Sequence, residues 1–140
     1  MSDSDILIRE AVAADQTAID TFDVFAGDRG AEILAGEVVV AVCDGEVAAY
    51  MMHNRRFYQK PFIWLVCVKE SYQRRGIAAQ LLGWAEKHYG QDAALFSSTE
   101  ADNDAMLRLF AKRGYEPSGS IENIQEVAEV VYRRRSDMEK

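Results

Sequence analysis

The sequence predicts a mixed α/β fold in which helices cover both faces of one sheet of six or seven strands. The chain has 140 residues, 49% of them hydrophobic, which is enough to bury the core of one domain spanning residues 1–140. Apolar runs rich in β-branched residues alternate with segments whose apolar residues recur at helical spacing. Meandering strands come first and a strand–helix–strand–helix unit follows, an order typical of a layered α/β domain.

The first half of the chain contains three predicted strands and one main helix. Asp15 is placed to cap a helix that runs to about Phe25. Asp44-Gly45 is a strong signal for a tight hairpin turn between two strands. The predicted elements are a strand over 6–11, a helix over 15–25, one helical turn over 31–35, and strands over 37–44 and 46–58.

The second half begins with a turn marked by Lys60-Pro61. The run 62–68 that follows is almost entirely apolar, so we expect this strand to be covered on both faces. Gly90 and Gly114 end two helices. The predicted elements are a helix over 75–89, a strand over 93–99, a helix over 103–113, a turn over 115–119 and a last strand over 126–135.

Charge and composition exclude several classes of protein. The formal net charge is −7, which disfavours a nucleic-acid partner. Cys43 and Cys67 lie in apolar runs without metal-ligand spacing, so we expect neither a metal site nor a disulfide scaffold. The N-terminus is acidic where a signal peptide is basic, and the longest apolar run is too short to span a bilayer. We therefore expect a soluble cytoplasmic protein with no membrane partner.

The stretch "SYQRRGIAAQLL" (71–82) places two arginines where a helix begins. Cations are unfavourable at the positive end of the helix dipole unless an anion binds there. Gly76 lets a ligand approach the backbone, and Arg74 and Arg75 can close over it from the sides. Pyrophosphate fits such a site best. On the local sequence alone, a solvated loop without a ligand is an equally weighted alternative.

Two motifs resemble those of the GNAT superfamily of N-acetyltransferases. The stretch "LVCVKESYQRRGIAAQLL" (65–82) resembles the family's acetyl-CoA motif, with Gln73, Gly76 and Ala78 at the matching positions after an apolar strand. The stretch "NDAMLRLFAKRGYE" (103–116) resembles the family's downstream segment and follows in the family's order. The positions that match in this second stretch are Asn103, Phe110, Gly114 and Tyr115.

The resemblance implies the GNAT fold, a mostly antiparallel sheet whose parallel strands 62–68 and 93–99 splay apart to hold the acyl group. It also implies acetyl-CoA as cosubstrate. The backbone of Val66, Cys67 and Val68 would pair with the pantetheine arm, and the Cys67 amide would stabilise the oxyanion. The other implied cofactor-binding residues are Gln73, Arg74, Arg75, Gly76, Ile77, Ala78 and Ala79 around the pyrophosphate, Asn103 at the pantetheine region, and Phe110 as a wall of the thioester pocket.

The implied reaction is direct attack of an amine on the thioester in a ternary complex. A lysine-like amine, with a pKa near 10.4, must lose a proton near neutral pH. The family's usual groups for proton transfer are absent, because Phe110 stands where many members have Tyr and Ser98 where N-terminal protein acetyltransferases have Glu. The candidates that remain are Glu100, which we take as the base, and His53, Tyr50 and Tyr115.

The acceptor stays open at this point. Acidic residues at 20, 23, 28 and 32 favour a cationic acceptor, whereas the basic and aromatic stretch 53–59 favours an acidic or aromatic one. The prediction is an N-acetyltransferase that acts on a primary amine of a small molecule or peptide. A non-catalytic acyl-CoA sensor and a protein N-acetyltransferase are the alternatives, and a homodimer and a longer acyl donor are left open.

Overall fold

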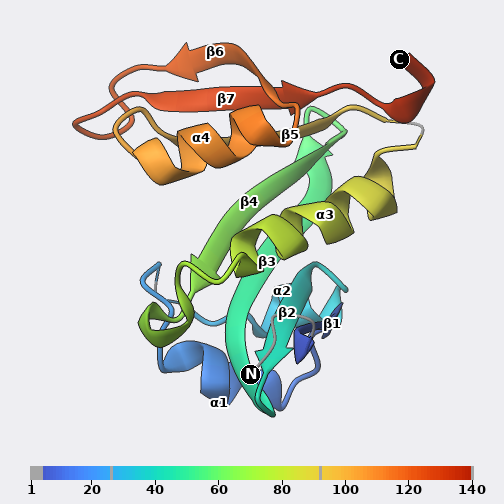
Figure 1. Ribbon diagram of the computed structural model, residues 1–140, viewed down its shortest axis with the longest axis vertical. Helices are drawn as coiled ribbons and strands as arrows, with labels where there is room; N and C mark the ends of the chain where they lie inside the picture. The colour runs from blue at the N-terminus through green and yellow to red at the C-terminus, as the bar shows by residue number, and fades with distance from the viewer. Residues whose placement is uncertain (1–4, 26, 92, 140) are drawn as a thin grey trace. The chain divides into compact units, whose positions relative to one another are not determined.

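The computed structural model describes residues 5–25, 27–91 and 93–139. Its strands, labelled in Figure 1, are β1 (Leu7–Glu10), β2 (Val38–Cys43), β3 (Glu46–Phe57), β4 (Lys60–Val68), β5 (Leu95–Glu100), β6 (Glu116–Ile121) and β7 (Glu129–Arg134). Its α-helices are α1 (Asp15–Asp20), α2 (Gly30–Leu34), α3 (Ile77–Tyr89) and α4 (Asp104–Lys112). A short 3₁₀ helix, Glu70–Tyr72, lies between β4 and α3, and another, Asp137–Glu139, follows β7.

The strands form one seven-stranded sheet in the order β1-β2-β3-β4-β5-β7-β6. β4 and β5 pair in parallel, whereas β1 with β2, β2 with β3, β5 with β7, and β6 with β7 are antiparallel. The parallel register covers two residue pairs, Phe62 with Phe96 and Ile63 with Ser97. The predicted mixed α/β fold, with a mostly antiparallel sheet of six or seven strands, is confirmed.

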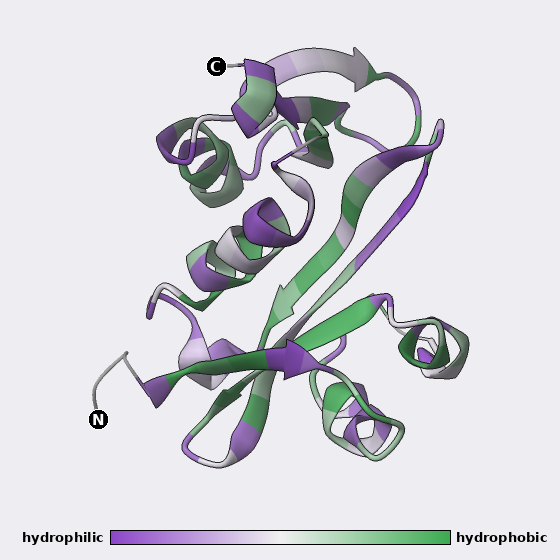
Figure 2. Ribbon diagram, turned by 90° about the vertical axis from the view of Figure 1, so that its right-hand side faces the viewer, coloured by the Kyte–Doolittle hydropathy of each residue, from purple (hydrophilic) through white to green (hydrophobic). Residues whose placement is uncertain are grey.

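The chain forms two compact units. The first consists of Met1–His53 with Leu65–Trp84, and the second of Asn54–Trp64 with Ala85–Lys140. In the first unit, α1 and α2 lie on one face of β2 and β3, and the first turns of α3 lie on the other face, as Figure 2 shows. The assignment of a single domain to residues 1–140 stays a prediction.

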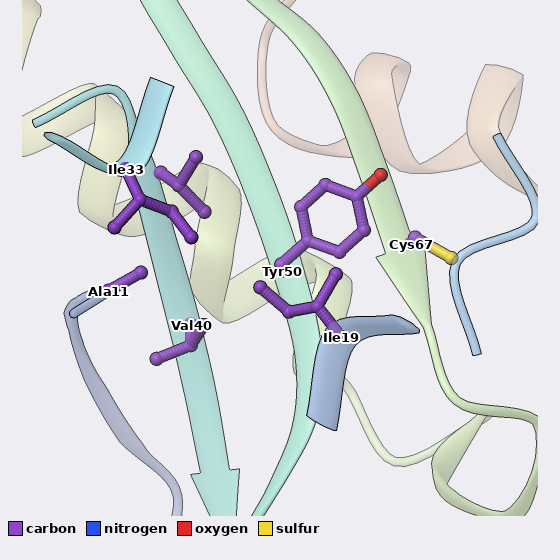
Figure 3. Close-up of a cluster of buried hydrophobic side chains, with 7 residues drawn as sticks. Ala11, Ile19, Ile33, Val40, Tyr50 and Cys67 are labelled. Atoms are coloured by element: carbon purple, nitrogen blue, oxygen red, sulfur yellow. The ribbon is translucent and has the colours of Figure 1, made fainter. Parts of the chain in front are cut away.

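The core of the first unit forms where β2 and β3 meet the first two helices. Val38 and Val40 of β2 are fully buried and join one cluster with Ile19 of α1 and Tyr50 of β3 (Figure 3). Val39, between them, is also fully buried, and strand alternation directs it to the opposite face. Because β2 is covered on both faces, its sequence is a continuous apolar run rather than an alternating one.

The two hairpin turns differ in how well the sequence predicts them. Asp44 and Gly45 adopt φ of 54° and 80°, the left-handed pair expected of an Asp-Gly turn. The next turn, expected at Lys60, instead lies at Tyr58 and Gln59, whose φ values are 51° and 66°. Neither residue type favours the left-handed region, so the local sequence carries no signal for this turn.

α1 ends at Asp20, whereas the predicted helix runs to Phe25. The Asp23 carboxylate accepts a hydrogen bond from the Phe25 amide (3.0 Å) and another from the Tyr50 hydroxyl (2.7 Å). A short Asp side chain that bonds its own backbone competes with the helix, and the contact with β3 fixes the non-helical path. This tertiary contact overrides the apolar spacing that predicted the longer helix.

β6 lies partly where the sequence predicts a turn, and β7 is shorter than the strand expected over 126–135. β6 is the outermost strand beside β7, and its register shifts between Pro117 and Gly119. An edge strand tolerates Pro because its missing N–H interrupts no central ladder. The Pro and Gly that indicate a turn in the sequence therefore occupy an irregular edge strand in the fold.

The second unit has its own aromatic and ionic core. Phe110 of α4 is fully buried, with its ring centroid 4.8 Å from that of Tyr132 of β7 and 5.1 Å from that of Tyr115. Glu86, near the end of α3, accepts two hydrogen bonds from Arg113 (2.9 and 2.8 Å) and one from Tyr115 (3.1 Å). These contacts tie the end of α3 to the end of α4 and to β7.

The hydrogen bonds of Asp15, at the start of α1, predict how the free energy of unfolding depends on pH. Asp15 accepts hydrogen bonds from Arg9 (2.8 and 3.0 Å) and from the Val12 amide (2.8 Å), and the bond from Arg9 is the main reason why the pKa of Asp15 is lowered. A lowered folded-state pKa stabilises the protein above the unfolded value, about 3.9, and this stabilisation is lost as pH falls through the folded pKa. Asp15→Asn should therefore lower the free energy of unfolding by about 1–3 kcal/mol above about pH 5.

Urea denaturation from pH 2.5 to pH 8 checks this expectation. The difference between wild type and Asp15→Asn should be constant from about pH 5 upward and shrink below about pH 4. Asp20→Asn, on the exposed face of the same helix, is the control and should follow wild type. A difference that persists undiminished at the lowest pH would contradict the assignment.

Candidate functional site

The segment between β4 and α3 forms a loop with two left-handed residues. Arg74 has φ of 66° and Gly76 has φ of 79°. A Cβ atom at Gly76 would meet nothing within 4 Å, so the backbone there faces open space. α3 begins at Ile77 and its first backbone N–H groups have no helical acceptor. The loop therefore combines an open approach with the positive end of a helix, an arrangement that binds anions.

Side chains of the loop tie it to β4 and keep positive charge at the surface. The Gln73 amide Nε2 donates to the carbonyl of Val68 across 3.1 Å. The Arg75 guanidinium carbon lies 4.9 Å from the centre of the Tyr72 ring, within cation–π range. Arg74 and Arg75 are both exposed. The phosphate-binding roles that the sequence assigns to these residues stay predictions.

A cavity of about 820 Å³ lies in the first unit beside this loop. The last residue of α1 and the four that follow it, residues 20–24, line one side, and residues 68–71 with Gln73 line the other. A volume of this order accommodates a small organic ligand or one arm of a larger one. The lining residue Lys69 forms an ion pair with Glu46 (2.9 Å), which offsets its positive charge. The carboxylates of Asp20 and Glu70 therefore make the lining acidic. The loop 20–24 was not among the residues that the sequence assigned to coenzyme binding.

The Cys67 thiol is a structural group rather than a nucleophile. Cys67 is 5% exposed, and its Sγ–H donates to the carbonyl of Phe22 across 3.5 Å. Burial raises the pKa of this thiol, which keeps it protonated and unreactive near neutral pH. A role of Val66, Cys67 and Val68 in binding therefore rests on their backbone groups and stays a prediction.

A buried carboxylate anchors the loop that lines the cavity. Asp23, whose side chain is 2% exposed, accepts hydrogen bonds from Tyr50 (2.7 Å) and from Arg29 Nε (3.1 Å). Burial alone would favour the neutral acid, but the hydrogen bonds from Tyr50 and Arg29 outweigh it and the pKa of Asp23 is lowered. Burial, and secondarily the bond to Asp23, raises the pKa of Tyr50, so this hydroxyl keeps its proton. Sequence reasoning missed Arg29, since no local pattern links it to Tyr50.

The second unit holds a pair of carboxylates at the end of β5 and the start of β7. Glu100 and Glu129 are register partners on these antiparallel strands. The Ser98 hydroxyl donates to Glu129 Oε2 across 2.7 Å, and Gln125 Nε2 lies 3.3 Å from the other oxygen. Diagonal neighbours on paired strands face the same side, which explains the contact. The sequence gives no sign of the contact between Ser98 and Glu129, because the two residues are 31 positions apart.

Other predicted site residues of the second unit have structural contacts. The Asn103 side-chain oxygen accepts from the Met106 amide (3.3 Å) and caps α4. Phe110 lies in the aromatic core. Burial and the neighbouring Glu86 charge raise the pKa of Tyr115, whose hydroxyl donates to Glu86. Tyr115, 3% exposed, is therefore committed to the core, which disfavours it as a proton donor. In the first unit, His53 is also buried, with its ring 5.1 Å from that of Trp84.

The described residues contain neither a metal-binding cluster nor a membrane-spanning helix. Among residues 5–25, 27–91 and 93–139, no group of His, Cys, Asp and Glu side chains is arranged to hold a metal ion. No helix in the same residues has both the length and the apolar character needed to cross a membrane.

Comparison with known families identifies the class of this protein. The family model described as "Acetyltransferase (GNAT) family" matches residues 8–115. This range runs from the second residue of β1 to beyond α4 and includes the loop before α3 and the cavity beside it. The chain therefore belongs to the GNAT acetyltransferase family. None of the curated proteins compared with the chain matches it in sequence.

Solved structures share the whole fold at low sequence identity. A GNAT-family acetyltransferase from Bacillus cereus superposes with a TM-score of 0.83 at 23% identity, covering 94% of this chain and 97% of the other. The protein yncA from Salmonella typhimurium, solved with its cofactor acetyl-CoA, has a TM-score of 0.74 at 18% identity and covers 95% of both chains. Diaminobutyrate acetyltransferase EctA from Paenibacillus lautus, solved with its substrate and coenzyme A, has a TM-score of 0.69 at 18% identity, with 91% and 93% covered.

The burial of Phe110 yields a prediction about stability. Truncating a fully buried aromatic side chain removes apolar contacts and leaves a cavity, so Phe110→Ala should lower the free energy of unfolding by about 3–5 kcal/mol. Arg108→Ala, on the exposed side of the same helix, should change it by less than about 0.5 kcal/mol. Urea denaturation measures both values. Equal effects of the two substitutions would show that Phe110 does not support the core.

Proposed function

We propose that this protein is an N-acetyltransferase that uses acetyl-CoA and transfers the acetyl group to a primary amine of a small molecule or peptide. The observation that carries the proposal is the loop 73–76, with its left-handed backbone, exposed arginines and open space beside Gly76 at the start of α3. Membership of the acetyltransferase family and a fold neighbour solved with acetyl-CoA support the same ligand. When bound, acetyl-CoA supplies an acyl thioester that an amine can attack directly.

The residues of the first unit fit the phosphates of this cosubstrate. We expect the backbone amides from Arg74 to Ala79 to donate to the pyrophosphate, while the two arginines add charge-assisted hydrogen bonds. The bond from Gln73 to Val68 holds the loop against the end of β4. We propose that the backbone of residues 66–68 orients the pantetheine arm and that the Cys67 amide faces the thioester carbonyl, where a fixed donor favours developing negative charge.

Two residues of the second unit remain proposed contacts of the cosubstrate. Asn103 uses its side-chain oxygen to cap α4, so a contact with the pantetheine region would use its amide nitrogen. Phe110, buried against Tyr115 and Tyr132, would support a wall of the thioester pocket from within the core. Neither role requires a hydroxyl group at position 110.

Proton transfer from the acceptor amine falls to a carboxylate in this proposal. Glu100 is the base proposed from the sequence, and Glu129, its register partner, is a second carboxylate at the same strand ends. The Ser98 hydroxyl holds Glu129 in one orientation, which favours a defined role in proton transfer. Tyr50 and Tyr115 are poorer candidates, since both hydroxyls donate to buried carboxylates.

The setting of the reaction is also part of the proposal. A cytoplasmic location is part of the proposal, and the formal net charge of −7 supports the absence of a nucleic-acid partner. The acidic lining of the cavity supports an acceptor that carries positive charge. A homodimer is compatible with the proposal. The residues of the first unit that we assign to binding all come from one chain and do not depend on a second subunit.

A non-catalytic acyl-CoA sensor is the second candidate. Two observations favour it: Phe110 stands in place of a tyrosine, and the hydroxyls of Tyr50 and Tyr115 already donate hydrogen bonds to carboxylates. An assay of CoA release over a panel of primary amines separates the two. Release with at least one amine supports the enzyme, whereas acetyl-CoA binding without release for every amine supports the sensor.

A matched pair of glycine substitutions tests the phosphate site. Gly76 and Gly45 have φ of 79° and 80°, and neither position has an atom within 4 Å of an added Cβ. Alanine should therefore strain both backbones by a similar amount, about 1–2 kcal/mol. Only Gly76→Ala should weaken CoA binding, by about tenfold or more, which corresponds to about 1.4 kcal/mol.

Isothermal titration calorimetry with CoA measures this difference. Gly45→Ala should bind as wild type does, because its strain lies in the turn between β2 and β3. Wild-type affinity in folded Gly76→Ala protein, or equal weakening in both variants, would count against phosphate binding at this loop.

Substitutions at the two strand ends test the base. If Glu129 accepts the proton, Glu129→Gln should lower kcat by about 10²–10⁴-fold, because the amide cannot act as a base. Ser98→Ala breaks the same 2.7 Å hydrogen bond but keeps the carboxylate, so its loss should be much smaller. Steady-state kinetics from pH 6 to pH 9 with the best amine of the panel measures both.

Glu100→Gln tests the other carboxylate as the base. A large loss in Glu100→Gln with little change in Glu129→Gln would assign the base to Glu100. Equal losses in Glu129→Gln and Ser98→Ala would point to a structural role of the hydrogen bond. If both carboxylate variants kept full activity, neither carboxylate would be the base.

A further inference from the structure

One wall of the cavity is a segment without regular structure. α1 ends at Asp20 and α2 begins at Gly30, so the cavity-lining residues 21–24 lie in the connection between two short helices. Val24 of this segment is 79% exposed and faces the cavity as part of its lining. A connection of this kind holds a fixed shape only if contacts outside it compensate the lost conformational entropy.

The contacts that fix this segment converge on Asp23. Tyr50, in the middle of β3 and fully buried, donates to Asp23 Oδ1 across 2.7 Å. Arg29, just before α2, donates to Oδ2 across 3.1 Å. The Phe25 amide also donates to Oδ1, across 3.0 Å. Both carboxylate oxygens of Asp23 are thus engaged by groups from a rigid strand and from the far end of the connection.

Contacts on either side of Asp23 hold the neighbouring residues. The Cys67 thiol of β4 donates to the Phe22 carbonyl, and Figure 3 shows this side chain on β4 beside Tyr50 of β3. The Phe22 ring lies 6.3 Å from the Tyr50 ring. The Arg29 amide donates to the Gln16 side chain of α1 across 2.8 Å. The segment is therefore held to β3, to β4 and to both helices that it connects.

We propose that Asp23 is a positioning residue: its buried carboxylate, held by Tyr50 and Arg29, fixes residues 20–24 as a wall of the cavity and so sets the affinity for the amine acceptor. This inference rests on the proposed function, since it takes the side of the cavity formed by residues 20–24 as the place where the acceptor binds, opposite Val68 and Gln73, which we assign to the cosubstrate. Asp23 acts through the segment it holds, because its side chain is 2% exposed and both of its oxygens are already bonded.

Tyr50→Phe is the variant that tests the proposal. Removing Asp23 would leave the Arg29 cation in a buried position without its carboxylate, so that variant risks failing to fold. Tyr50→Phe deletes one hydroxyl and keeps the ring in the core. Tyr115→Phe is the matched control, because Tyr115 is equally buried and its hydroxyl also donates to a buried carboxylate that an arginine holds, Glu86 with Arg113.

Three measurements on the full chain separate positioning from general stability. In Tyr50→Phe, hydrogen exchange of the amides in residues 21–25 and 27–29 should accelerate at least tenfold, while Tyr115→Phe leaves them unchanged. The KM for the best amine of the panel should rise at least fivefold with kcat within about twofold of wild type. Calorimetry with CoA should give an affinity within twofold of wild type in both variants.

Each alternative outcome has a defined meaning. Unchanged hydrogen exchange of residues 21–25 and 27–29 in Tyr50→Phe, or the same KM increase in Tyr115→Phe at a similar loss of Tm, would overturn the proposal. A fall in kcat at constant KM would overturn it in favour of a proton-transfer role for Tyr50. If wild type binds CoA but transfers to no amine, the proposed function fails in its catalytic part, while the hydrogen exchange still decides whether Asp23 fixes the loop.

Discussion

Each unit of this protein buries a carboxylate, and the cost of burying that charge organises the contacts around it. Asp23 is held by Arg29 and Tyr50, and Glu86 by Arg113 and Tyr115. A buried carboxylate is tolerated only when charged and polar donors satisfy its oxygens, so its partners become fixed in space. In the first unit this fixes the connection between two helices, and in the second it joins the ends of α3 and α4.

The same hydrogen bonds limit which side chains can take part in a reaction. The tyrosine hydroxyls at positions 50 and 115 donate to carboxylates and have raised pKa values, so they hold the structure together rather than exchange protons. The buried Cys67 thiol is likewise kept neutral. The arginines before α3 are exposed, and Glu100 and Glu129 lie where β5 ends and β7 begins. The proposed roles in anion binding and in proton transfer therefore fall to different residues.

The loop before α3 shows how a backbone conformation prepares a binding surface. Left-handed φ at Arg74 and Gly76 turns the chain from the end of β4 into the helix, and the space beside Gly76 is open. The helix supplies partial positive charge at that point, and the arginines add full charges near it. Positive charge thus accumulates at this loop although the chain as a whole has a net charge of −7. An anion bound there, as we propose, would offset the unfavourable placement of two arginines at the positive end of the helix.

The sequence by itself determined the elements whose signals are local. The β-branched run of β2, the Asp-Gly turn, the helical spacing of α3 and α4, and the Gln73, Gly76 and Ala78 motif each depend on residues close along the chain. Tertiary structure decided where α1 ends, that β6 is a strand, and which partners the buried groups find. Tyr50 reaches Asp23 across 27 residues and Ser98 reaches Glu129 across 31. Such pairs arise from strand register and packing, which no local spacing encodes, because their energy is gained only when distant segments meet.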